Sequence, residues 1–196
     1  MKYKIIVAVV SLLITCSLPA QKNNKPASII YLIVIWARIM MMRGPLPSFM
    51  HFADKGEAKI LATIASTKYE GVAAVLDVFN TFFNRSDIPI AVPKGKALEL
   101  KDWQHWTDTL IANYPHTIKN NDEVPDAIDL YRNVLSAQPD KSVTIVTVGF
   151  LTNLSNLLQS NPDKYSSLNG KELVQKKVKQ LVCMAARFPA GKEFKC

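Results

Sequence analysis

Short apolar runs alternate with longer stretches of helical spacing along most of this chain, and this alternation constrains the fold more than any other feature. Four segments have the length and apolar content of buried strands: residues 58–65 (AKILATIA), 87–92, 143–148 (VTIVTV) and 179–184. Apolar side chains recur at helical spacing in residues 72–83, 127–135 and 151–158. This pattern predicts an α/β fold with an open, mostly parallel sheet and helices on both faces. Ligands of such sheets bind beyond the carboxyl ends of the strands.

Single residues predict several local features. Thr67 and Glu70 have the spacing of a capping box before the helix that follows. Pro125 stands where the next helix can begin. Residues 98–114 are polar with two tryptophans, and we expect them to be partly helical and near the surface. Cys183 lies in an apolar strand pattern and is expected to be a small buried hydrophobe.

The first twenty residues have the pattern of a secretory signal. Lys2 and Lys4 precede an apolar run over residues 5–14, and Ala20 stands before a polar stretch. We therefore expect a signal peptide at residues 1–20, one partial domain at residues 21–196, and export to a periplasm or cell surface. A lipoprotein signal at Cys16 is the alternative. The apolar run is too short for a membrane anchor, so no stable membrane span is expected.

The excess of basic over acidic residues does not by itself indicate a nucleic-acid partner. The formal net charge is +8, but the basic residues are scattered, and the one dense cluster lies at residues 171–179. A basic balance alone supplies only non-specific attraction to nucleic acid. We interpret the cluster as a solvated face before a strand, and expect no nucleic-acid binding.

Two segments resemble nucleoside hydrolases, in particular the inosine/uridine-preferring family. The first resembles the family pattern Thr-Gly-Pro-Leu-Thr-Asn-Leu through Gly149, Leu151, Thr152, Asn153 and Leu154, with Phe150 in place of the proline. The second, from residue 178 through Met184 to Glu193 and Phe194, is similar to the pattern Val-x-x-Ile-Val-x-Met-Gly-Gly…Glu-Phe-Asn. There Ala185 and Ala186 replace the two glycines and Lys195 replaces the asparagine. The resemblance covers roughly residues 52–196.

The resemblance implies calcium-assisted cleavage of the N-glycosidic bond of ribonucleosides to ribose and free base. Water is a poor nucleophile, so a metal ion must lower its pKa and a carboxylate must accept its proton. In the family, an Asp-x-Asp-x-x-x-Asp-Asp cluster after the first strand binds calcium and the ribose hydroxyls. The implied partner is a nucleoside or another ribosyl small molecule.

Four residues of this chain match family site positions. Val148 stands where the family offers a backbone carbonyl to calcium, and Met184 and Glu193 fall on positions that line the ribose pocket. Thr67 falls near an asparagine that contacts ribose in the family, and a helix cap accounts for this threonine at least as well. The family's later strands, with a further calcium aspartate and a catalytic histidine, lie beyond Cys196, so we expect a domain incomplete at its C-terminus. His51, His105 and His116 are expected at the surface or in loops.

The aspartate cluster itself is missing, because no acidic residue precedes Asp54. Calcium prefers several oxygen ligands, so we expect this chain not to bind the Ca²⁺ of the family.

Methionine is always ATG, and reading residues 40–42 one nucleotide earlier therefore gives GAT, the codon for aspartate, twice. Permitted upstream codons extend the same frame to Phe-Asp-Ser-Asp-Met-Gly-Pro-Asp-Tyr-Asp-Asp, which fits the family motif. We hypothesise compensating insertions or deletions near residues 30–31 and 51–52. Alternatively, residues 29–35 form the buried first strand and residues 39–42 begin a core helix.

Three functional interpretations follow from these residues. The first is an exported nucleoside hydrolase by ancestry that has no catalytic residues left. The second is a non-catalytic exported protein that binds a sugar or a partner through the same strand-end face. The third is an unstable fragment with an unfinished sheet edge, which is an aggregation liability.

Overall fold

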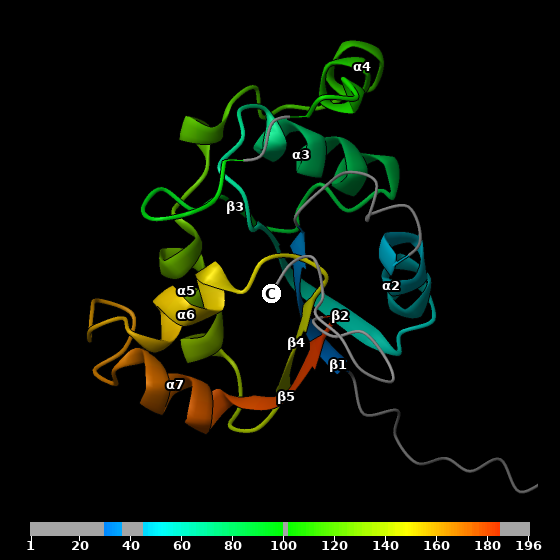
Figure 1. Cartoon of the computed structure of the whole chain (residues 1–196). Helices are drawn as coiled ribbons and strands as arrows, with labels where there is room; N and C mark the ends of the chain where they lie inside the picture. The colour runs from blue at the N-terminus through cyan, green and yellow to red at the C-terminus, as the bar shows by residue number, and fades with distance from the viewer. Residues whose placement is uncertain (1–29, 37–44, 100–101, 185–196) are drawn as a thin grey trace, which may run out of the picture.

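A computed structural model describes residues 30–36, 45–99 and 102–184, and its centre is a five-stranded parallel sheet (Figure 1). The strands are β1 (Ile30–Trp36), β2 (Ala58–Ala65), β3 (Ile90–Ala91), β4 (Val143–Thr147) and β5 (Val178–Cys183). Their order in the sheet is β3-β2-β1-β4-β5, and every neighbouring pair is parallel. The predicted α/β class with a parallel sheet is therefore confirmed.

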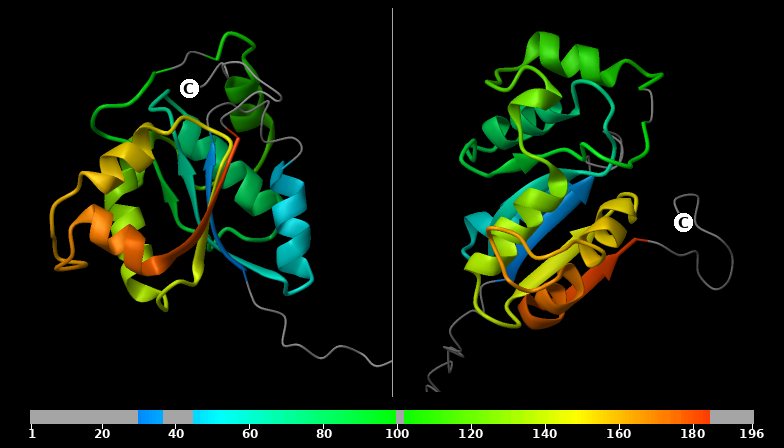
Figure 2. Two further views of the ribbon diagram at one scale, coloured as in Figure 1. Left: turned by 60° about the horizontal axis from the view of Figure 1, so that its bottom comes forward. Right: turned by 90° about the vertical axis from the view of Figure 1, so that its left-hand side faces the viewer.

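Helices cover both faces of the sheet (Figure 2). They are α2 (Pro45–Asp54), α3 (Val72–Phe82), α4 (Trp106–Asn113), α5 (Ala127–Ala137), α6 (Thr152–Leu158) and α7 (Gly170–Lys177), with a 3₁₀ turn η1 (Asn121–Glu123). Strand β4 has the β-branched sequence VTIVT and is buried on both faces. Val146 packs with α2 and α3 on one face, while Val143 and Ile145 pack with α5, α6 and α7 on the other.

The first strand, β1, is the central strand of the sheet. Its backbone pairs with β2 on one side and with β4 on the other. The prediction of a first strand at residues 29–35 is confirmed within one residue at each end. The predicted signal peptide at residues 1–20 and the helix start at residues 39–42 lie outside the described residues. Within the described ranges, no helix has the length and apolar character needed to cross a membrane.

The start of α3 differs from the sequence prediction. Helix α3 has Gly71 as its N-cap residue, with a φ of 82° and no side-chain cap, so the predicted capping box of Thr67 and Glu70 is wrong. The amide of Asn121 supplies a remote cap instead. Its Oδ1 accepts a hydrogen bond from the backbone N–H of Ala73 at 3.1 Å, and its Nδ2 donates to the carbonyl of Tyr69 at 2.9 Å. The cap comes from 48 residues further along the chain, so local spacing could not reveal it.

Two further expectations, both for the C-terminal part of the described chain, differ from the structure. Cys183 is exposed, because it lies on β5, which is the outermost of the described strands. The basic stretch at residues 171–179 contains helix α7, which the sequence analysis did not predict. A capping box between Asn169 and Glu172 begins this helix, with the Glu172 backbone N–H donating to Asn169 Oδ1 at 3.0 Å. The lysines of α7 are mostly solvated as expected, and Lys177 pairs with Asp140 at 2.9 Å.

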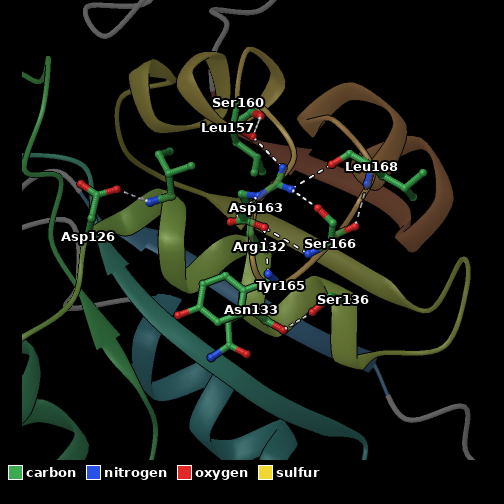
Figure 3. A network of polar contacts seen from close by, with 11 residues as sticks. Asp126, Arg132, Asn133, Ser136, Leu157, Ser160, Asp163, Tyr165, Ser166 and Leu168 are labelled. Carbon is green, nitrogen blue, oxygen red and sulfur yellow. Dashed lines mark hydrogen bonds and ion pairs between the residues drawn. The ribbon is translucent and has the colours of Figure 1, made fainter.

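A buried arginine ties α5 to the loop between α6 and α7 (Figure 3). The Arg132 side chain donates to Ser160 Oγ at 2.9 Å and to the carbonyls of Ser166 and Leu168 at 3.0 and 2.9 Å. Its Nε also lies 2.7 Å from Asp163 Oδ2. A buried guanidinium needs such partners, because its charge loses hydration on burial. This cluster holds a loop without regular secondary structure against the core.

Candidate functional site

The carboxyl ends of β2, β1, β4 and β5 lie together at one end of the sheet, which we call the strand-end edge. The topology predicts a ligand site there. Thr67 lies two residues after β2, Val148 directly follows β4, and Met184 directly follows β5. The structure thus brings three of the four predicted site residues to the same edge. The fourth, Glu193, lies outside the described residues.

Thr67 is held by its own loop. Its Oγ1 donates to the carbonyl of Leu98 at 3.0 Å and accepts from the backbone N–H of Tyr69 at 3.2 Å. The side chain is buried, and its backbone forms an isolated bridge with Leu98. The threonine therefore joins the end of β2 to the loop after β3. Its role as a ribose contact stays a prediction.

Hydrogen bonds across the end of the central strand join the loops after β2 and β4. Ser66 Oγ accepts from the backbone N–H of Phe150 at 3.0 Å. Asn153 Nδ2 donates to the carbonyl of Ala65 at 2.7 Å. Both side chains are fully buried. These contacts fix the turn that leads from β4 into α6, and with it the position of Val148.

Asn153 is a residue whose role the sequence analysis did not identify. It is part of the Leu-Thr-Asn pattern at residues 151–153, which was the signal available in the sequence. In the structure it stands in the first turn of α6 and reaches back to the end of β2. It is a positioning residue for the strand-end edge.

The turn after β4 is further shaped by Thr147. Its Oγ1 accepts from the backbone N–H of Gly149 at 3.2 Å, and its carbonyl accepts from the N–H of Met184 at 2.9 Å. Met184, directly after β5, is 43% exposed. Strands β4 and β5 therefore end at the same level, and a ligand at the edge could touch both.

The donors at this edge do not fit a calcium ion. In the described part of the chain, no group of three or more His, Cys, Asp and Glu side chains is close enough to hold a metal. The predicted ligand, the backbone carbonyl of Val148, can supply one oxygen, whereas Ca²⁺ takes six to eight. The edge offers hydroxyl, amide and backbone groups. Such groups can hydrogen-bond a sugar, but none of them is a general base at neutral pH.

The three histidines are not part of this edge. His51 is exposed on α2. His105 is exposed before α4 and lies 3.0 Å from Asp108, and the His116 ring contacts the carbonyl of Tyr114 at 2.9 Å. Their expected places at the surface or in loops are confirmed.

An apolar cavity lies away from the strand-end hydroxyls. It has a volume of about 260 Å³ and is formed by α2, α3, α4 and the residues directly after α3 and α4. Its lining residues are Pro47, Val78, Phe79, Phe82, Phe83, Leu110 and Tyr114. Apart from the Tyr114 hydroxyl, these side chains offer no group for acid–base chemistry, so the cavity is not a candidate active site.

Solved structures with a similar fold include a plant nucleoside hydrolase and two effector proteins. A plant nucleoside hydrolase, the PpNRh1 enzyme, matches with a TM-score of 0.56 and 18% identity, over 80% of this chain and 48% of that chain. The type III effector XopQ, solved in complex with adenosine diphosphate ribose, matches with a TM-score of 0.57 and 14% identity, over 83% of this chain and 44% of that chain. The effector protein XOO4466 matches with a TM-score of 0.60 and 13% identity, over 83% of this chain and 45% of that chain.

No sequence-family profile and no curated protein sequence matches the chain. The chain therefore has a nucleoside hydrolase-like fold, and it spans about half the length of the solved structures that it matches.

Proposed function

We propose that this chain is an exported, catalytically inactive relative of calcium-dependent nucleoside hydrolases. The observation that carries the proposal is the absence of carboxylates where that chemistry needs them. The sequence has no Asp or Glu before Asp54, and the described strand-end edge holds no cluster of metal-ligating side chains. Without a carboxylate or a metal, no described group at this edge can activate water for attack on the sugar.

Calcium-dependent release of ribose from inosine or uridine is therefore expected to stay at the level of a buffer control. Losing a general base alone costs on the order of 10²–10⁴ in rate, and losing the metal removes a further contribution. The measurement is a reducing-sugar assay with the purified chain in millimolar calcium and in a chelator. An active nucleoside hydrolase serves as the positive control. Turnover above the buffer that disappears with the chelator would overturn the proposal.

A second candidate function is the binding of a ribosyl ligand without catalysis. Two observations favour it: XopQ was solved with adenosine diphosphate ribose, and the carboxyl ends of four parallel strands lie together at the strand-end edge, where such sheets bind ligands. Hydrogen bonds to ribose hydroxyls do not require a metal. We expect calorimetric titration with adenosine diphosphate ribose to show saturable binding that calcium does not change. Equal heats for the ligand and for a ribose-free control, such as adenine, would exclude this function.

We also propose that residues 1–20 direct export and are removed after Ala20. The supporting features are Lys2 and Lys4, the apolar run after them and the small residue at the cleavage position. The intact mass of the exported protein tests this, since cleavage leaves Gln21 at the N-terminus. A lipid-modified Cys16 or a retained Met1 would contradict it.

The acid-free segment before Asp54 is proposed to result from compensating frame changes. The shifted frame spells an aspartate cluster, whereas the present frame still gives residues that pack: Leu46 and Met50 on α2 are both 1% exposed. Loss of the motif is thus compatible with a packed α2. Independent sequencing of the locus tests the idea. Methionine codons force only the last two aspartate codons, so a gene without GAT at the joins of Leu32 with Ile33, Val34 with Ile35 and Arg38 with Ile39 would refute it.

A further inference from the structure

Asn169 and Gly170 form the one Asn-Gly dipeptide of the sequence. In such a pair the glycine backbone nitrogen can attack the side-chain Cγ of the asparagine, because glycine has no Cβ to hinder the approach. The N–Cγ bond forms, the bond from Cγ to Nδ2 breaks, and Nδ2 leaves as ammonia with the proton of the glycine N–H. Water then opens the resulting succinimide to aspartate or isoaspartate. The dipeptide is therefore a candidate site for deamidation, a modification that needs only water.

The fold requires both residues of this dipeptide. Asn169 caps α7: its Oδ1 accepts from the backbone N–H of Glu172, and its own N–H donates to Glu172 Oε2, each at 3.0 Å. Gly170 is buried at the start of α7, against the end of α6. A Cβ on it would lie 1.6 Å from the Leu157 carbonyl oxygen, so no larger residue fits. Capping and packing therefore place a reactive pair next to each other in the chain.

The folded state holds the two reacting groups in other hydrogen bonds. The Gly170 N–H donates to the Ser160 carbonyl at 2.8 Å. The Asn169 amide oxygen is bound to the first turn of α7. Attack requires the glycine nitrogen to leave the Ser160 carbonyl and the asparagine amide to rotate out of its cap. The reaction therefore needs the loop before α7 to open first.

The Arg132 cluster holds this loop closed (Figure 3). The loop between α6 and α7 covers residues 159–169 and has no regular secondary structure. Arg132 binds it at both ends, through Ser160 Oγ at 2.9 Å and the Leu168 carbonyl at 2.9 Å. Ser160 also accepts the glycine N–H, and Leu168 directly precedes the dipeptide. The arginine thus restrains both sides of the reacting pair.

We propose that Asn169 is a site of spontaneous deamidation whose rate is set by local opening of the loop that Arg132 holds. The rate in the folded chain is the rate in the open loop multiplied by the fraction of time that the loop is open. Loops open locally at a lower free energy than the whole fold. Aspartate at this position still caps α7 and adds a negative charge at its N-terminus, which is favourable. Isoaspartate adds a carbon atom to the main chain and disrupts the cap, so the two products differ in stability.

Peptide mapping by mass spectrometry tests the site in the full chain, incubated near neutral pH either folded or unfolded in guanidinium chloride. We expect deamidation at Asn169 to be at least about tenfold slower in the folded sample, because the closed loop protects the pair. Asn169→Ser keeps a capping hydroxyl and should give no product at this position. Equal rates in the folded and unfolded samples, or no product in the unfolded one, would overturn the proposal.

Variants separate local opening of the loop from unfolding of the whole chain, with circular dichroism to confirm that each is folded. Arg132→Met removes the centre of the cluster, and Ser160→Ala is the milder change, since it removes only the hydroxyl that Arg132 binds. We expect Ser160→Ala to speed deamidation of the folded chain at least about fivefold, through the lost hydrogen bonding, and Arg132→Met to speed it more. The control Asn121→Ala removes the remote cap of α3 and destabilises the fold away from the loop. Equal acceleration by Asn121→Ala, or none by Ser160→Ala, would show that the loop does not set the rate.

Discussion

Replacing Arg132 by methionine is expected to lower the free energy of unfolding by about 3–5 kcal/mol, because this residue is the buried centre of a polar cluster. Its side chain is 1% exposed and donates to Ser160, Ser166 and Leu168, and it pairs with Asp163 (Figure 3). Methionine fills part of the space but donates no hydrogen bond. The acceptors around it then lose their partner, which costs about 1–3 kcal/mol for each one that water cannot reach.

Urea denaturation followed by circular dichroism measures this loss. The matched control is Asp54→Asn, which breaks the ion pair between Asp54 and Arg85. The Asp54 side chain is 64% exposed, so this control should cost at most about 1 kcal/mol. If Arg132→Met lowered the free energy of unfolding no more than the control does, the polar cluster around Arg132 would not stabilise the fold as we infer.

The same cluster gives the stability a defined dependence on pH. The hydrogen bond from Arg132 holds the pKa of Asp163 below its ordinary value, against partial burial, and the N–H groups of Ser166 and Tyr165 add to this. A depressed folded-state pKa means that the contribution is present above the unfolded pKa of about 3.9 and is lost as the pH falls through the folded-state pKa. The stability difference between the wild type and Asp163→Asn should therefore shrink below about pH 4. A constant difference from pH 7 to pH 2.5 would contradict this assignment.

The strands that are buried on both faces could be predicted from the sequence. The bounds of β2 agree with the prediction, and β4 agrees within one residue. Burial on two faces leaves a continuous apolar run, which is a strong local signal. The predicted strand at residues 87–92 is only Ile90–Ala91 in the structure, because Pro89 lacks the N–H needed for an extended ladder.

Features that depend on distant partners could not be predicted in this way. The cap of α3 comes from Asn121, far along the chain, so Thr67 and Glu70 were a misleading local match. Cys183 was expected inside the core because its strand is apolar. The position of a strand in the sheet also decides burial, and β5 is the outermost of the described strands. Helix α7 was not predicted, because its apolar face consists only of Leu173 and Val174 and lies among several lysines in the sequence.

The candidate site could be located but not completed. Strand-end topology correctly placed Thr67, Val148 and Met184 at one edge, because parallel strands end together. The contacts that organise this edge, from Ser66 to Phe150 and from Asn153 to Ala65, span more than 80 residues of sequence. Such contacts have no local pattern, and only the fold brings them together.

Replacing Gly170 by alanine is expected to be as damaging as the loss of Arg132, for a steric reason. A Cβ at this position would lie 1.6 Å from the Leu157 carbonyl oxygen and 2.6 Å from Ser160 Oγ. The Leu157 oxygen belongs to the backbone and cannot rotate away, so α6 and α7 would have to separate. Overpacking of a core costs about 1–3 kcal/mol when side chains can adjust, and a backbone clash should cost more, about 3–5 kcal/mol.

Gly95→Ala is the matched control, since a Cβ at Gly95 meets nothing within 4 Å. Its free energy of unfolding should stay within about 0.5 kcal/mol of the wild type. The clash at Gly170 also displaces Ser160, whose hydroxyl accepts from Arg132 and whose carbonyl accepts from the Gly170 N–H at 2.8 Å. Gly170→Ala and Arg132→Met thus disrupt the same loop, and their combined cost should be smaller than the sum of the two. Strict additivity would show that the clash and the arginine cluster act on the fold independently.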